Sequence, residues 1–147
     1  MKYKSLIVDT SGFYAAYVED DDNFERADTV LEGIRNDELP YRPVYTNRFV
    51  LSELATLMLY RVGHHAAVEV LDDVLDSGIR VLNVDSSAFH NAKEGFEKYD
   101  DAEISFFDHL TAVLARENEI DHIFTFDESD FETLGFSAVP KETSVIE

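Results

Sequence analysis

Short apolar runs alternate with stretches of helical spacing along the whole chain. The apolar runs predict five strands, at 3–8, 44–45, 79–84, 122–126 and 136–139. Between them, apolar residues recur every three or four positions, which predicts helices at 12–18, 23–37, 47–61, 64–77, 86–99 and 105–118, and a helical turn at 128–134. This alternation is typical of an α/β fold, with helices packed on both faces of a central, mainly parallel sheet.

No repeat, linker or low-complexity tract divides the 147 residues, a length that suits one compact domain. Pro40 and Pro43 interrupt the helical pattern before the second strand, which we therefore expect to be short. The sequence predicts a single domain over residues 1–140 and a frayed C-terminal tail over residues 141–147.

The composition indicates a folded chain without cysteine chemistry. Apolar residues make up 45% of the sequence and aromatic residues 12%, enough to bury a sizeable core. The absence of cysteine excludes disulfide bonds, thiolate zinc sites and a cysteine nucleophile. The N-terminal apolar run is too short for a signal peptide, and no run approaches the ~18 apolar residues of a membrane span. We expect a soluble, cytoplasmic protein.

The net charge of −19 is unusual for a protein that binds nucleic acid, because 12 basic residues face 31 acidic ones. Three explanations stay open: the chain binds no nucleic acid, it binds a basic partner, or it comes from a salt-loving organism whose proteins have acidic surfaces. The low lysine content and the dispersed acids favour the third. In molar salt the Debye length falls to ~3 Å, which would screen repulsion from a polyanionic substrate.

Two acidic residues directly follow buried strands. Asp9 comes after Ser-Leu-Ile-Val, and Asp127 comes after His-Ile-Phe-Thr-Phe. In an open parallel sheet, the carboxyl ends of the strands border a common crevice where ligands bind. We therefore expect both carboxylates to point into one cleft, although they are far apart in the sequence.

Two further acids, Glu53 and Asp108, lie in apolar stretches of predicted helices, where a solvent-facing charge is not expected. Burial of an unpaired carboxylate costs several kcal/mol, so such acids are usually paired or bind cations. No lysine or arginine accompanies the four acids in their motifs, and a divalent cation would relieve their repulsion. Oxygen ligands without cysteine or a histidine pair favour Mg²⁺ or Mn²⁺ over Zn²⁺.

Each of these acids also has a simpler explanation when it is taken alone. Asp9 and Asp127 could each cap a helix. Glu53 could reach solvent from a half-buried helix, and Asp108 could complete a capping box with Ser105 at the start of its helix. Four independent explanations are less economical than one shared metal site.

Together the motifs resemble those of the PIN-domain nucleases, and most of all the VapC-like toxins of prokaryotic toxin–antitoxin pairs. The resemblance covers residues 5–139 and rests on four segments: Asp9-Thr-Ser, Glu53 in its apolar helix, Ser105-Phe-Phe-Asp108, and Thr125-Phe-Asp127-Glu-Ser-Asp130-Phe131. No acid that the family requires is missing, and the departure from the family is the acidic composition.

The resemblance implies a PIN-like three-layer α/β/α fold that cleaves single-stranded RNA, an antitoxin partner and a homodimer. One or two Mg²⁺ or Mn²⁺ ions would polarise a phosphodiester and lower the pKa of a water that attacks phosphorus. The expected catalytic and metal-binding residues are Asp9, Glu53, Asp108 and Asp127, with Asp130 as an additional metal ligand. Hydrogen bonds that orient these carboxylates are expected from Thr10, Ser11, Ser105 and Thr125.

Other functions fit the sequence less well. A phosphatase of the haloacid-dehalogenase type needs a second aspartate two positions after the first, where this chain has Ser11. A phosphoacceptor receiver domain needs an acidic pair and a lysine that are missing. Two alternatives remain open: a PIN-like module that binds or scaffolds without catalysis, and a stand-alone RNA-processing nuclease without an antitoxin. The RNA target cannot be read from the sequence.

Overall fold

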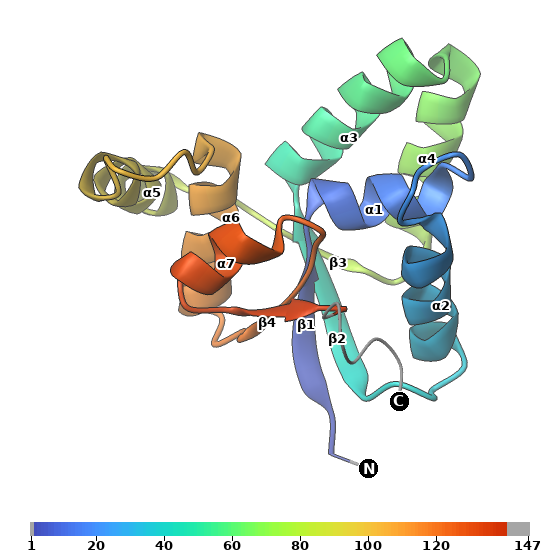
Figure 1. Ribbon diagram of the computed structural model, residues 1–147, viewed down its shortest axis with the longest axis horizontal. Helices are drawn as coiled ribbons and strands as arrows, with labels where there is room; N and C mark the ends of the chain where they lie inside the picture. The colour runs from blue at the N-terminus through green and yellow to red at the C-terminus, as the bar shows by residue number, and fades with distance from the viewer. Residues whose placement is uncertain (1, 141–147) are drawn as a thin grey trace.

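A five-stranded, fully parallel sheet runs through the protein, whose computed structural model describes residues 2–140 (Figure 1). Its strands are β1 (Lys4–Val8), β2 (Tyr41–Asn47), β3 (Arg80–Leu82), β4 (His122–Phe124) and β5 (Ser137–Val139), in the spatial order β3-β2-β1-β4-β5. Because every neighbouring pair is parallel, all the carboxyl ends of the strands lie at the same edge of the sheet. The predicted tail at 141–147 lies outside the described residues.

Helices cover both faces of this sheet. They are α1 (Thr10–Tyr17), α2 (Phe24–Arg35), α3 (Arg48–Arg61), α4 (His64–Asp76), α5 (Ser86–Lys98), α6 (Phe106–Glu117) and α7 (Glu128–Thr133). Figure 1 shows α1 and α2 on one side of the sheet and α6 and α7 on the other. Within the described part of the chain, no helix combines the length and the apolar character that a membrane crossing requires.

The central strand β1 divides the core between the two helical layers. Leu6 and Val8 pack with residues of α1, α2, α3 and α4, whereas Ile7 packs with residues of α6 and α7. Successive side chains of a strand point to opposite faces, so a run of apolar residues is expected where both faces are covered. The predicted three-layer α/β/α architecture with a parallel sheet is therefore confirmed.

The second strand is longer than predicted and contains a proline that we expected to precede it. Lys4 of β1 pairs with Tyr41, and Leu6 pairs with Val44, so two steps along β1 correspond to three along β2. This irregularity is a bulge, where Pro43 is tolerated because it has no N–H to contribute to the ladder. The prolines do follow the end of the helical pattern, as predicted, but the strand already begins at Tyr41 instead of at Val44.

The strands β3 and β4 end earlier than predicted, at Leu82 and Phe124. Beyond β4, the N–H of Phe126 donates to the hydroxyl oxygen of Ser11 (2.9 Å). The backbone N–H of Phe126 is therefore bonded to the start of α1 and not to a neighbouring strand.

Gly12 allows the first helix to approach the sheet closely. The helix begins at Thr10, earlier than predicted. A Cβ atom at Gly12 would lie 2.5 Å from the carbonyl oxygen of Phe124, so only glycine fits this contact without a shift of the backbone. The same carbonyl oxygen accepts a hydrogen bond from the N–H of Asp9 (3.1 Å). The close approach of α1 to β4 therefore helps to place the two segments that carry Asp9 and Asp127.

Candidate metal centre

Asp9 lies where β1 ends and α1 begins, and its side chain is buried, with 3% of the residue exposed. It occupies the N-cap position of α1, but its side chain forms no capping hydrogen bond. The alternative in which this carboxylate only caps a helix was therefore wrong.

Two hydroxyl groups hold the Asp9 carboxylate in place. Thr125 and Ser11 both donate to its Oδ2 atom, at 2.8 and 3.1 Å. The same hydroxyl oxygens accept hydrogen bonds from the backbone, Thr125 from the N–H of Asp127 (3.0 Å) and Ser11 from the N–H of Phe126 (2.9 Å). This network joins the start of α1 to the loop after β4, so Asp9 and Asp127 are oriented together.

Asp108 enters the site from the first turn of α6. Ser105 caps this helix, because its Oγ accepts a hydrogen bond from the N–H of Asp108 (3.1 Å), as the sequence predicted. Among the described residues, the Asp108 carboxylate accepts no hydrogen bond from the backbone N–H of Ser105, so the alternative of a complete capping box was wrong. The carboxylate is instead buried beside the other acids, with 7% of the residue exposed.

Asp127 follows the loop after β4 and precedes α7. Like Asp9, it occupies an N-cap position without forming a side-chain capping bond. Its side chain is the most exposed of the three central carboxylates.

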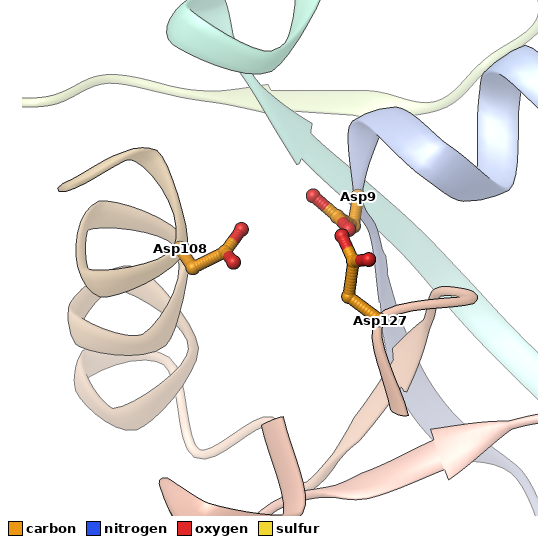
Figure 2. A group of neighbouring side chains, drawn as sticks. All are labelled: Asp9, Asp108 and Asp127. Atoms are coloured by element: carbon orange, nitrogen blue, oxygen red, sulfur yellow. The ribbon is translucent and has the colours of Figure 1, made fainter. Parts of the chain in front are cut away.

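The three aspartates Asp9, Asp108 and Asp127 converge on one point. One carboxylate oxygen from each lies within 4.8 Å of the others. Figure 2 shows their side chains pointing toward one another from the end of β1, from α6 and from the loop before α7. These residues are separated by up to 118 positions in the sequence, and the parallel sheet brings them together because β1 and β4 are neighbours.

Burial and mutual repulsion make the ionised forms of these acids unfavourable. Burial raises the pKa of Asp9 to about 6, against the hydrogen bond from Thr125, which lowers it, and with a further rise from Asp127. Burial also raises the pKa of Asp108 to about 8, and the charge of Asp9 contributes next. The pKa of Asp127 is raised by burial and then by Asp130 and Glu53.

Glu53 and Asp130 lie at the edge of this group. Both raise the pKa values of Asp108 and Asp127 by repulsion, so their charges are close to the site. Neither places an oxygen within the group of three. Both are half-buried, on α3 and α7 respectively.

The predicted supporting residues have different roles. Ser11 and Thr125 contact Asp9 directly, whereas Ser105 caps α6. A hydrogen bond from the backbone N–H of Thr10 lowers the pKa of Asp9, whereas the buried Thr10 hydroxyl has no hydrogen-bond partner within residues 2–140.

A set of buried polar residues at the end of β2 was not predicted from the sequence. Thr46 donates to the carbonyl oxygen of Val8 (3.1 Å), next to Asp9. Asn47 caps α3 through the N–H of Val50 (3.0 Å) and donates to Thr111 of α6 (3.3 Å). The sequence does contain a signal for these residues, a Thr-Asn pair between a strand and a helix. It was not recognised because the strand was predicted to stop at residue 45.

Comparison with known proteins shows the family to which the chain belongs. The family model described as the PIN domain matches residues 6–137. Over 99 residues, the chain is 34% identical to the 23S rRNA-specific endonuclease VapC20 of Mycobacterium tuberculosis, a match that covers 67% of this chain and 75% of that protein.

Solved structures agree. The crystal structure of Mycobacterium tuberculosis VapC20, described as a sarcin-ricin loop cleaving toxin, matches with a TM-score of 0.79 at 29% identity, over 89% of this chain and 95% of that one. DNA-bound VapBC from Salmonella typhimurium matches with a TM-score of 0.67 at 14% identity, over 92% of this chain and 96% of that one, which shows a shared fold. These matches confirm the resemblance inferred from the motifs, and the protein belongs to the PIN-domain family, in its VapC-like branch.

Proposed function

We propose that this protein is a metal-dependent endoribonuclease, with Asp9, Asp108 and Asp127 as the ligands of a divalent cation. The observation that carries this proposal is the convergence of three carboxylates within 4.8 Å. Glu53 and Asp130 contribute from the edge, as further ligands or by orienting water at the site.

The residues fit a hard divalent cation such as Mg²⁺ or Mn²⁺. All the donors are carboxylate oxygens, which these ions prefer. Within residues 2–140, no lysine or arginine is among the charges that shift the pKa values of the three aspartates, so no described basic side chain offsets their repulsion. A bound ion would supply that compensation, polarise a phosphodiester and lower the pKa of a water molecule.

The chain's own residues prepare the ligands. Ser11 and Thr125 both donate to the Oδ2 atom of Asp9, so no hydroxyl group within the described part of the chain donates to Oδ1, which can act as a ligand. Asp108, with a pKa of about 8, holds a proton at neutral pH in the metal-free protein. Binding of a cation would therefore release that proton, and metal affinity is expected to increase with pH.

We also propose a substrate and a partner for this protein, by analogy with its relatives. VapC20 is named for cleavage of 23S rRNA, and ribosomal RNA is therefore the first substrate to test. We propose that the protein is the toxin of a toxin–antitoxin pair, active in the cytoplasm and held inactive by an antitoxin. A homodimer, as the resemblance implies, is to be tested by light scattering.

The decisive experiment compares wild type with Asp9→Asn on purified ribosomal RNA. The reactions contain Mg²⁺, Mn²⁺ or EDTA, across a salt series that reaches molar concentration because the chain carries a net charge of −19. Cleavage by wild type alone, abolished by EDTA, is the expected result. No cleavage at any salt, together with no rise in melting temperature on addition of metal, would refute the proposal.

A further inference from the structure

A pocket of about 370 Å³ opens beside the carboxylates, between α1 and α3. Glu53 and Asp127 line its side nearest the metal centre, Tyr14 lines it from α1, and Arg61 lines it from α3. A pocket of this volume lies at the small end of the range for ligand sites. Because Glu53 and Asp127 border the pocket, a substrate bound at the carboxylates would also contact it.

One face of α3 forms a wall of this pocket. Glu53, Leu57 and Arg61 follow one another at intervals of four residues, and all three line the pocket. The rise of an α-helix places the Cα atoms of Glu53 and Arg61 ~12 Å apart. The α3 face therefore runs from an acidic end at the metal centre to a basic end at Arg61.

Of the described residues that line the pocket, Arg61 is the only basic one. Its guanidinium lies over the ring of Tyr14, 5.2 Å from the ring centroid. Among the described residues it forms no ion pair, although Asp21 also lines the pocket. This cation–π contact holds the guanidinium beside Tyr14, and its N–H groups have no carboxylate partner among residues 2–140.

In so acidic a chain, such an arginine beside the metal centre is expected to contribute strongly to the binding of RNA. With a net charge of −19, the protein repels the backbone of RNA, and affinity depends on the few sites where a basic group faces the substrate. An arginine fork matches the geometry of a phosphate group.

We propose that Arg61 binds an RNA backbone phosphate that flanks the one cleaved at the carboxylates, and that Tyr14 positions its guanidinium. This inference rests on the proposed nuclease function, and in it the contact between Arg61 and phosphate positions the RNA at the carboxylates. The simpler role for Arg61, a favourable charge at the C-terminus of α3, would affect the stability of the helix but not the binding of RNA.

The test is the binding of a fluorescein-labelled, single-stranded RNA oligonucleotide of mixed sequence, measured by fluorescence anisotropy across a KCl series. Ca²⁺ serves as the divalent ion, because it shares the oxygen ligands of Mg²⁺ but not its geometry. The variants are Arg61→Ala, Arg61→Lys, Tyr14→Phe and Tyr14→Leu. Arg80→Ala is a matched control, since Arg80 also lies over a tyrosine ring (5.9 Å, Tyr45) but at the start of β3, away from the carboxylates.

We expect Arg61→Ala to raise the Kd roughly tenfold. Its plot of log Kd against log salt should become less steep by ~0.7, the contribution of one phosphate contact on a single strand. Arg61→Lys should keep the slope, because it keeps the charge. Tyr14→Phe should bind like wild type and Tyr14→Leu more weakly, since stacking needs only the ring.

Two results would overturn the inference alone: an Arg61→Ala protein with the Kd and salt slope of wild type, or an equal loss in Arg80→Ala. Melting temperatures of all variants, measured in parallel, separate a lost contact from a lost fold. If wild type neither binds nor cleaves RNA, the proposed function fails and this inference fails with it.

Discussion

Replacement of Asp9 by asparagine should stabilise the metal-free protein, although Asp9 is buried and hydrogen-bonded. Burial raises its pKa from 3.8 to about 6, so ionisation at pH 8 costs folding free energy. This rise in pKa from 3.8 to about 6 corresponds to ~3 kcal/mol at most. The amide of asparagine is also costly to bury, which reduces the expected gain to about 1–3 kcal/mol. The oxygen of the introduced amide can still accept the hydrogen bond from Thr125.

The sign of the pH dependence follows from the direction of the shift. Because the pKa of Asp9 is raised in the folded state, its contribution to stability is fully present below the unfolded value of 3.8. That contribution is lost as pH rises through the folded value of about 6. The gain from Asp9→Asn should therefore be greatest near pH 8 and roughly half as large at about pH 5.

The assay is thermal unfolding in EDTA at several pH values above the isoelectric point of 4.4. The melting temperature of Asp9→Asn should exceed that of wild type by roughly 3–10 °C at pH 8. Asp72→Asn, an exposed acid on α4, removes one charge without touching the site and serves as the control. In Mg²⁺ or Mn²⁺ the order should reverse, because wild type alone keeps the full ligand set.

Two outcomes would contradict this reasoning. If Asp9→Asn melts below wild type in EDTA at pH 8, burial of the ionised Asp9 carboxylate does not reduce the stability of the folded protein. An equal gain in Asp72→Asn would assign the effect to the net charge of the chain.

Three further perturbations test other parts of the structure. Gly12→Ala should lower the melting temperature, despite the better helix propensity of alanine, because its Cβ would meet the carbonyl oxygen of Phe124 at 2.5 Å; a rise in calorimetry would refute this contact. Thr125→Val should raise the pKa of Asp9 in the metal-free protein, since it removes a hydrogen bond that lowers it, so the Asp9 carboxyl signal followed by NMR in EDTA should titrate at higher pH than in wild type; an unchanged titration would argue against that bond. Ser105→Ala should cost ~1 kcal/mol in urea unfolding through loss of the α6 cap, and no change would mean that the cap is dispensable.

The sequence by itself determined the order of strands and helices and the acidic residues that are candidates for a metal site. The periodicity of apolar residues is a local property, and it located all the strands and helices of the described chain, with errors at their ends. Acidic residues in apolar surroundings are also a local signal, which is why Asp9, Asp108 and Asp127 could be named as candidates.

Only the tertiary structure decided which candidates meet. The order β3-β2-β1-β4-β5 places β1 beside β4, and with it Asp9 beside Asp127. Glu53 was named from a local signal as strong as that of Asp108, yet it lies outside the group of three because of the position of α3. The contacts of Asn47 with α6 and the stacking of Arg61 on Tyr14 were equally hidden. These relations depend on the packing of elements distant in the chain, which no local pattern of residues encodes.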